Sequence, residues 1–245
     1  MEQLLKIHLH MPKTAGTTFK SILSKNYSDE EILDVYESFQ NHKEVVERLK
    51  NIQLDVVEWL NCHLSFGIHK YVEIPSTYIT FLRDPVDRII SEYFFILRHA
   101  NHHLHNKVKK MNLLEFQGEQ VNMNKQCKII CGKPLEEALE ENEHKKASEI
   151  IKEHFAFVGI TELFTESVYL MKKKFNWDTI TYSRKNVTQN RNGISDECIQ
   201  AIRENNQIDI TLYNAEKERL EKQLSSLDKR SKRQLNLLLN RYKIN

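Results

Sequence analysis

The strongest constraint on the fold lies near the start of the chain, where a short apolar segment runs into a glycine-containing loop and then into a helical pattern. Residues 4–9 are rich in apolar side chains and predict a buried strand. Phe19, Ile22 and Leu23 recur at helical spacing, so we expect a helix to begin near Thr17. A strand, a tight loop and a helix in this order direct free backbone N–H groups toward one point, which favours binding of phosphate and other anions.

The loop between strand and helix carries groups that suit an anion, although its residue order is unusual. Lys13 supplies a full positive charge, and three threonines supply hydroxyl donors. The Walker A pattern requires a glycine, four further residues and then Gly-Lys-Ser/Thr, whereas here Lys13 precedes Gly16 and no glycine stands five residues before Gly16. The loop is therefore either a phosphate loop of a different design or an ordinary turn with a solvated lysine. The threonines are Thr14, Thr17 and Thr18.

Composition restricts the class of protein. The chain has 245 residues, enough for one sizeable core, and its 6 glycines and 4 prolines against 29% charged residues favour a helix-rich soluble domain over a β-sandwich or a disordered chain. The net charge is only +2, which argues against the strongly basic face of a nucleic-acid-binding domain. Any recognition of an anion must therefore be local.

Nothing in the sequence predicts a metal site, a disulfide framework or a membrane span. The four cysteines lack the second Cys or His pair that would complete a zinc site, so we expect buried free thiols. The first apolar segment is too short for a signal peptide, and no apolar run is long enough to cross a bilayer. We therefore expect a cytoplasmic protein, if the chain is complete at its N-terminus. The cysteines are Cys62, Cys127, Cys131 and Cys198.

A second strand-to-helix junction carries another pair of anion-binding side chains. Residues 77–82 are β-branched and aromatic and predict a buried strand, and Pro85 suits the first turn of a helix. Arg83 therefore follows the carboxyl end of a strand, where open α/β sheets bind ligands, and Ser91 lies about two turns into the helix. Arginine offers a planar fork to phosphate. The alternative is that Arg83 pairs with a neighbouring aspartate in a capping network.

The rest of the chain alternates between helical and strand patterns. Residues 155–161 predict a third buried strand, and residues 163–175 predict a helix after it. Residues 26–60 predict one or two amphipathic helices, the first starting at Ser28 with Glu31 at the capping-box position. We also expect helices over residues 134–140 and 147–153, a polar basic loop over residues 182–193, and a charged helical tail over residues 215–245 that docks on the domain or pairs with a second copy in a homodimer.

Three segments in this order resemble the PAPS-dependent sulfotransferases, where PAPS is 3′-phosphoadenosine 5′-phosphosulfate. Residues 12–18 resemble the 5′-phosphosulfate-binding loop of that family, and residues 83–93 resemble its 3′-phosphate-binding segment. Residues 157–162 resemble a strand of the carbohydrate sulfotransferase branch, which includes the heparan 2-O-sulfotransferases and bacterial relatives. The resemblance implies an α/β, P-loop-type fold of three layers with a mostly parallel central sheet, helix-rich overall. The sulfotransferase domain would span residues 1–215, and the helical tail residues 216–245.

The resemblance also implies roles for particular residues. Arg83 and Ser91 would hold the 3′-phosphate, and Lys185 and Arg191 would cap the nucleotide from the basic loop. His63 falls where the branch keeps a catalytic histidine. Two departures from the family pattern precede it: Cys62 stands where relatives often have a glycine, and Asn61 stands where some relatives carry a second histidine. The 5′-phosphosulfate would be held by Pro12, Lys13, Thr14, Ala15, Gly16, Thr17 and Thr18.

The implied reaction moves a sulfuryl group from PAPS to a hydroxyl of an acceptor, for which the branch implies a carbohydrate. His63, with an unperturbed pKa near ~6.5, would take the proton of the hydroxyl. Lys13 would stabilise the negative charge on the leaving adenosine 3′,5′-bisphosphate (PAP), and no metal is expected. A small or neutral acceptor remains open from the sequence. So do two other functions, a P-loop kinase and a non-catalytic nucleotide-binding module.

Overall fold

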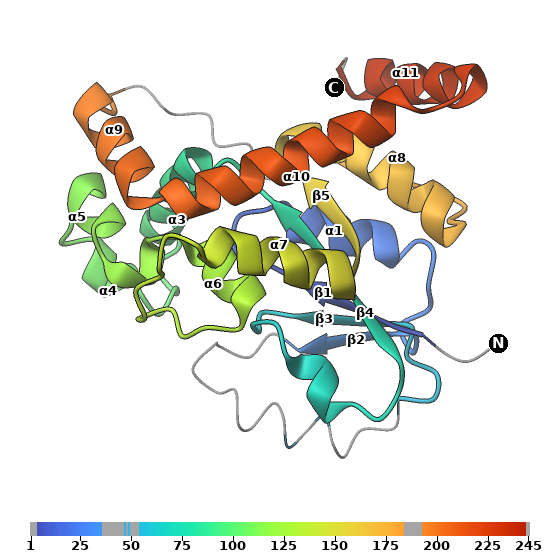
Figure 1. The fold of residues 1–245 in the computed structure, drawn as a ribbon, viewed down its shortest axis with the longest axis horizontal. Coiled ribbons are helices and arrows are strands. Elements are labelled where there is room, and N and C mark those ends of the chain that lie inside the picture. The colour runs from blue at the N-terminus through green and yellow to red at the C-terminus, as the bar shows by residue number, and fades with distance from the viewer. Residues whose placement is uncertain (1–3, 36–46, 48, 50–53, 184–192, 244–245) are drawn as a thin grey trace.

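Five parallel strands form the centre of the molecule (Figure 1). The computed structural model describes residues 4–35, 47, 49, 54–183 and 193–243. The order of the strands across the sheet is β2-β3-β1-β4-β5, and each neighbouring pair is parallel. The strands are β1 (Leu5–Leu9), β2 (Ile32–Val35), β3 (Trp59–Cys62), β4 (Ser76–Leu82) and β5 (Phe155–Ile160).

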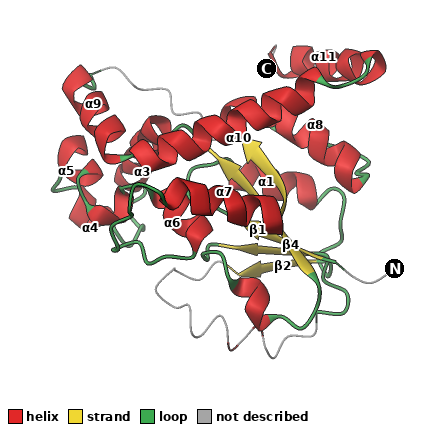
Figure 2. Ribbon diagram, in the orientation of Figure 1, coloured by secondary structure: helices red, strands yellow, loops and turns green. Residues whose placement is uncertain are grey.

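Helices cover both faces of the sheet (Figure 2). In Figure 1, α7 crosses in front of the strands and α1 lies behind β5. No described helix is long and apolar enough to cross a membrane. The α-helices are α1 (Gly16–Leu23), α3 (Pro85–Arg98), α4 (His105–Val108), α5 (Leu113–Gln117), α6 (Lys125–Cys131), α7 (Glu143–His154), α8 (Phe164–Phe175), α9 (Asp196–Asn205), α10 (Gln207–Ser225) and α11 (Lys229–Lys243). Short 3-10 turns span Ile68–Tyr71, Gln120–Asn122 and Thr161–Leu163.

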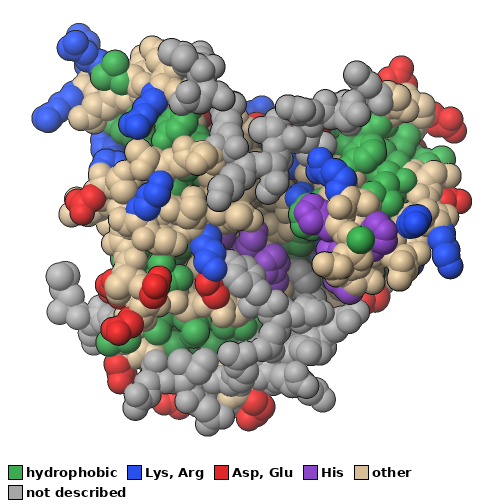
Figure 3. Space-filling model, turned by 180° about the vertical axis from the view of Figure 1, so that it is seen from behind, with side chains coloured by type: hydrophobic (Ala, Val, Ile, Leu, Met, Phe, Trp, Pro, Cys, Tyr) green, Lys and Arg blue, Asp and Glu red, His purple; other side chains and the backbone are tan. Residues whose placement is uncertain are grey.

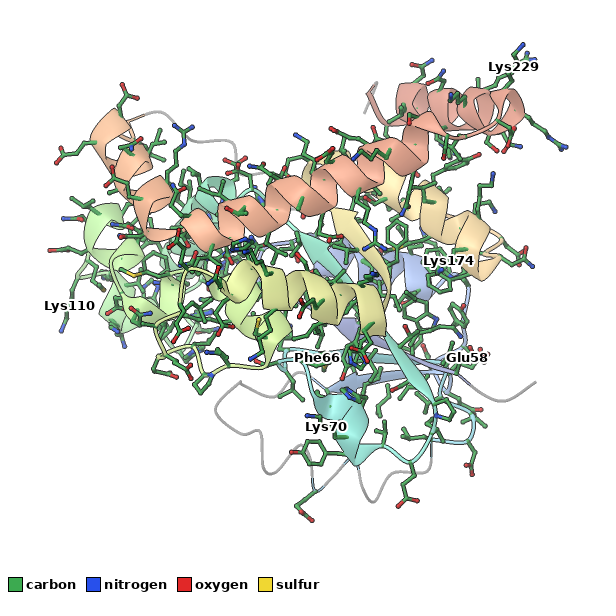
Figure 4. The ribbon with its side chains drawn as sticks, viewed as in Figure 1. Glu58, Phe66, Lys70, Lys110, Lys174 and Lys229 are labelled. Carbon is green, nitrogen blue, oxygen red and sulfur yellow. The ribbon has the colours of Figure 1, made fainter. Side chains whose placement is uncertain are left out.

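Aromatic side chains attach helices to the two faces of the sheet. On one face, Phe19 of α1 contacts Trp59 of β3 and Phe81 of β4 edge to face, with ring centroids 5.8 and 5.2 Å apart. Tyr78 lies three residues before Phe81 and therefore points to the opposite face. There it contacts Phe66 at 5.0 Å, and Figure 4 shows Phe66 beside the C-terminal end of α7. The core thus consists of two apolar layers separated by the sheet.

The predicted fold class is confirmed, and so are its best-marked elements. The three predicted strands are β1, β4 and β5, and the predicted helix over residues 163–175 is α8. The tail forms α10 and α11, and the break between them follows Ser225, where the leucine spacing also breaks. The inner side of α11 packs on the domain, because Leu235 and Tyr242 are buried in the main core. Residue 215, where we placed a boundary, lies inside α10.

The prediction of a helix starting at Ser28 is wrong. The backbone N–H and Oγ of Ser28 do donate to the Glu31 carboxylate, at 2.7 and 2.8 Å, as in a capping box. The next residues nevertheless form β2, which pairs with β3 through Ile32↔Trp59. Pairing with a distant segment therefore overrides the local capping pattern. β2 lies within residues 26–60 and β3 begins there, while residues 36–46, 48 and 50–53 are outside the described residues.

The helix expected over residues 134–140 is also wrong, since this segment forms turns and irregular backbone. Side chains bind its carbonyl groups in place of a helical ladder. Lys128 Nζ donates to the Leu135 carbonyl at 2.7 Å, and Gln120 Nε2 donates to the Glu137 carbonyl at 3.1 Å. These contacts come from α6 and the 3-10 turn before it, so tertiary contacts decide the conformation here as well.

Candidate functional site

Three loops meet at the carboxyl edge of the sheet because the strands that precede them are parallel neighbours. β1 lies between β3 and β4 in the sheet. His10 follows β1, His63 follows β3 and Arg83 follows β4. The chain fills one side of β1 with β2 and β3 before it crosses to β4 and β5. This point is therefore the topological switch at which open α/β sheets bind ligands.

The loop after β1 has an unusual backbone. Lys13 and Ala15 adopt the left-handed region with φ values of 67° and 66°, although neither is glycine. Such residues persist only where surrounding contacts hold them, and they concentrate at functional sites. One such contact is the hydrogen bond from Thr14 Oγ1 to the Met11 carbonyl, 2.9 Å long and buried. Turns that include left-handed residues create concavities lined by backbone N–H groups, which bind anions.

Helix α1 begins directly after this loop and leaves its first amides available. Ala15 is the N-cap residue, and the Phe19 N–H donates to its carbonyl at 3.0 Å. The N–H groups of residues 16–18 precede this first bond of the helical ladder and lack acceptors within the helix. The Thr18 side chain is buried and the Thr17 side chain is exposed. The geometry predicted from the sequence, a loop and a helix N-terminus aimed at one point, is thus present.

The ring of His10, to which the sequence analysis gave no role, lies directly against Gly16. A Cβ atom at Gly16 would lie 1.9 Å from the His10 ring, so a larger residue requires that this ring or the start of α1 move. The His10 ring in turn lies 4.3 Å from the His63 ring, centroid to centroid. Burial lowers the pKa of His63 to about 4 and is also the main cause that lowers the pKa of His10 to about 2. Both rings are therefore neutral at pH 7, and His63 contacts the loop through His10.

Behind these rings runs a row of polar side chains across three strands. His8 Nδ1 lies 3.0 Å from Asn61 Oδ1, and Asn61 Nδ2 donates to Asp34 Oδ1 at 3.0 Å. The three residues occupy one register line of β1, β3 and β2. Lys20 of α1 forms an ion pair with Asp34. Because an amide oxygen only accepts, His8 Nδ1 carries the proton.

Arg83 joins the second predicted motif to the first. Its Nη1 donates to the Lys13 carbonyl at 3.0 Å, while Lys13 Nζ lies 3.8 Å from the centroid of the Phe95 ring. Burial, followed by the charges of Arg83 and Arg98, lowers the pKa of Lys13 to about 8. Several cationic groups therefore share a partly buried space, which is electrostatically suited to an anion. Figure 3 shows the opposite side of the molecule from Figure 1, where histidine side chains reach the surface close to Lys and Arg side chains.

The capping network of α3, considered as an alternative for Arg83, is built from the Asp84 carboxylate and backbone amides. Asp84 caps α3 by accepting from the Val86 and Asp87 amides at 2.9 and 3.1 Å. Among the described residues, Arg83 forms an ion pair with Glu162, with 3.9 Å between Arg83 Nε and Glu162 Oε1. Glu162 follows β5 and also accepts from the Asp84 amide at 3.2 Å. No motif marked Glu162 as a partner, since it is far from Arg83 in the chain.

The other predicted residues divide into two groups. Ser91 is buried on α3, one helical turn before Phe95, so it faces the side of α3 on which Lys13 lies. Lys185 and Arg191 lie outside the described residues. Among the described residues no three His, Cys, Asp or Glu side chains are placed to hold a metal ion. The four cysteines are free thiols, and Cys62, Cys127 and Cys198 are buried.

Comparisons with known proteins show which family this chain resembles. The model of the sulfotransferase family matches residues 6–215. No curated protein matches the chain. Among solved structures, the crystal structure of mouse sulfotransferase SULT7A1 complexed with PAP aligns with 98% of this chain and 85% of its own chain, at 12% sequence identity and a TM-score of 0.41.

Proposed function

This chain belongs to the sulfotransferase family, and from that premise we propose that it transfers a sulfuryl group from PAPS to a hydroxyl group of an acceptor. One observation carries the proposal: the contact of Arg83 Nη1 with the Lys13 carbonyl, which brings two cationic side chains of separate motifs together at the switch point of the sheet. PAPS carries a phosphosulfate and a 3′-phosphate, two anionic groups that this pair of motifs suits.

The residues present fit PAPS by the chemistry of their donors. The amides of residues 16–18, the hydroxyl groups of Thr17 and Thr18 at the start of α1, and Lys13 would hold the 5′-phosphosulfate, whereas the Thr14 hydroxyl already donates to the Met11 carbonyl. Arg83 and Ser91 would hold the 3′-phosphate, and Lys185 and Arg191 remain predicted to cap the nucleotide. Bound PAPS supplies the sulfuryl group that is transferred. Lys13 would place its charge beside the oxygen on which negative charge develops as PAP leaves.

His63 is the residue we propose as the proton acceptor. A general base must be neutral before it acts, and the lowered pKa of His63, about 4, keeps it so at physiological pH. His10 is the neighbouring alternative, but its pKa is lower still, about 2, and its ring fills the space beside Gly16. His63 is therefore the stronger base of the two. For the acceptor we propose a carbohydrate hydroxyl, on the resemblance of residues 157–162 to the carbohydrate branch.

Two substitutions test these roles. We expect Lys13→Ala to weaken PAP binding and to abolish transfer, because it removes a charge needed both for binding and for the leaving group. We expect His63→Ala to lower transfer by about 10²–10⁴-fold, the usual contribution of a general base, with PAP affinity unchanged. Transfer is measured with labelled sulfate on a panel of glycans and small alcohols, and PAP binding by calorimetry.

The control is His103→Ala, which removes an exposed histidine on the segment before α4 and should change neither quantity. Full activity of His63→Ala would contradict the assignment of His63 as the base. If His10→Ala loses activity and His63→Ala does not, His10 is the base instead. A protein that binds PAP but modifies no acceptor of the panel would instead be a non-catalytic nucleotide-binding module.

A further inference from the structure

A glutamine on α6 holds the backbone of Arg83 at both of its polar groups. The Arg83 N–H donates to Gln126 Oε1 at 2.9 Å, and Gln126 Nε2 donates to the Arg83 carbonyl at 2.9 Å. The Gln126 residue is 1% exposed. The pairing of β4 with β5 ends at Leu82↔Ile160. The Gln126 carboxamide therefore binds the backbone of the first residue after the described ladder.

Gln126 is itself fixed by a buried carboxylate of another helix. Its backbone N–H donates to Asp209 Oδ2 at 3.0 Å, and the next amide, that of Cys127, donates to Asp209 Oδ1 at 2.7 Å. Asp209 lies on α10 and is 1% exposed. A carboxylate that accepts from the first amides of a helix satisfies groups that have no partner within the helix, and its charge suits the positive helix end. The position of Gln126 is therefore set by packing of α10 on α6.

These contacts form one line of hydrogen bonds from α10 to the loop after β1. Asp209 binds Gln126, Gln126 binds the main chain of Arg83, and the Arg83 guanidinium binds the Lys13 carbonyl. The main chain and one nitrogen of Arg83 are thus held at separate points. The direction in which the remaining guanidinium N–H groups point is determined before any ligand binds, and such preorganisation raises affinity by reducing the ordering cost of binding.

We propose that Gln126 is a positioning residue that sets the preference for nucleotides bearing a 3′-phosphate, by holding Arg83 in the orientation that binds this group. The inference rests on the proposed function, in which Arg83 binds the 3′-phosphate. A carboxamide accepts from an N–H through its oxygen and donates to a carbonyl through its nitrogen, so this one side chain satisfies both polar groups of the Arg83 backbone. Glutamate lacks the donor when ionised, and methionine has a similar length but neither group.

The test compares two nucleotides that differ by the 3′-phosphate alone, PAP and adenosine 5′-monophosphate. Dissociation constants from calorimetry give the ratio by which the wild-type chain prefers PAP. We expect Gln126→Met to lower this ratio by about tenfold, the order that two neutral hydrogen bonds contribute, and to leave the affinity for adenosine 5′-monophosphate unchanged. Gln126→Glu should lower the ratio in the same direction, and it replaces the methionine variant if that one does not fold.

Gln117→Met is the matched control, because Gln117 is equally buried but accepts a hydrogen bond from Asn205, at 2.9 Å, and does not touch Arg83. We expect it to lower the melting temperature and to leave the ratio unchanged. Arg83→Ala should lower the ratio on its own, and adding Gln126→Met to it should lower the ratio no further, since Gln126 acts through Arg83.

The outcomes distinguish the role of Gln126 from the assignment of Arg83 to the 3′-phosphate. If Arg83→Ala lowers the ratio and Gln126→Met does not, the role of Gln126 is overturned and the proposed function stands. If Gln126→Met weakens both nucleotides equally, Gln126 is a structural residue only, and the inference is again overturned. If Arg83→Ala leaves the ratio unchanged, Arg83 does not bind the 3′-phosphate, and the assignment under the proposed function is contradicted.

Discussion

Lys13 combines three properties that separately are uncommon for a lysine. Its backbone is left-handed, its carbonyl accepts from Arg83, and its ammonium group lies over the Phe95 ring. An ammonium group over an aromatic face is stabilised by the ring quadrupole. Burial and the charges of Arg83 and Arg98 act in the opposite direction and lower the pKa of Lys13 to about 8. An anion bound beside Lys13 would offset that repulsion and raise the pKa again.

The affinity for PAP should therefore fall as the pH rises above about 8. Above that pH the free protein must take up a proton at Lys13 on binding, whereas below it Lys13 is already charged, so the loss appears on the alkaline side only. Calorimetry between pH 7 and pH 9.5 in two buffers of different ionisation enthalpy measures both affinity and proton uptake.

Lys13→Arg is the control for this pH dependence, because arginine stays protonated throughout the range. Its affinity for PAP, whatever its value at pH 7, should be independent of pH there. An affinity of the wild-type chain that stays constant from pH 7 to pH 9.5 would contradict the assignment of Lys13 to the bound anion.

At the scale of elements, β1, its loop and α1 behave as one unit. His8 of β1 and His10, two residues later, have stacked rings with centroids 5.4 Å apart. The centroid of the His8 ring also lies 4.6 Å from that of Phe19 in α1. His10 fills the space that Gly16 leaves at the start of α1. The width of the gap between strand and helix is thus matched to an imidazole ring. A change of one methyl group at this junction must displace either His10 or the first turn of α1.

Gly16→Ala should therefore destabilise the protein and weaken PAP binding together. Overpacking of a filled interior costs about 1–3 kcal/mol, and here it also displaces the amides of the anion-binding turn. Denaturant unfolding and calorimetry with PAP measure the two effects.

The matched control is Gly118→Ala. The φ of Gly118 is −72°, and a Cβ there would meet the carbonyl oxygens of Leu114 and Glu115 at 3.4 and 3.5 Å. We expect its stability to stay within about 0.5 kcal/mol of wild type, as for most surface substitutions, with PAP binding unchanged. Normal stability and binding in Gly16→Ala would mean that the site tolerates movement of His10.

For the whole molecule, the buried histidines link stability to pH. The pKa values of His8, His10 and His63 are about 3, 2 and 4, mainly because burial disfavours the charged ring. An unfolded histidine has a pKa near ~6.5, so between these values the unfolded chain binds more protons than the folded one. The free energy of unfolding is then highest above about pH 6.5 and falls as the pH decreases below it.

We expect each of the three histidines to contribute a loss of about 1.4 kcal/mol per pH unit below pH 6. Urea unfolding between pH 7 and pH 5 measures the slope. His8→Gln should reduce it by one histidine's share, because the pKa of His8 is one of the three that burial lowers. Equal slopes for wild type and His8→Gln would show that His8 does not contribute to this linkage.

Local patterns in the sequence were sufficient to predict three of the strands and the two anion-binding junctions of this protein. Apolar runs predicted β1, β4 and β5, since a buried strand needs such a run wherever it sits in the sheet. The loop of residues 12–18 and the junction at Arg83 were recognisable because anion-binding turns are built from consecutive residues. Together they indicated the α/β class and the family, and they placed each of two cationic motifs after a predicted strand.

Tertiary structure alone decided the rest. β2 and β3 are four residues each and carry Asp34 and Asn61, so their strand conformation comes from pairing with β1 and with each other. The contact of Gln126 with Arg83 joins segments 43 residues apart, and no periodicity or motif encodes such a distance. Hydrophobic periodicity determines which face of an element is buried. The order of the strands determines which side chains meet at their ends, and that order results from packing of the whole chain.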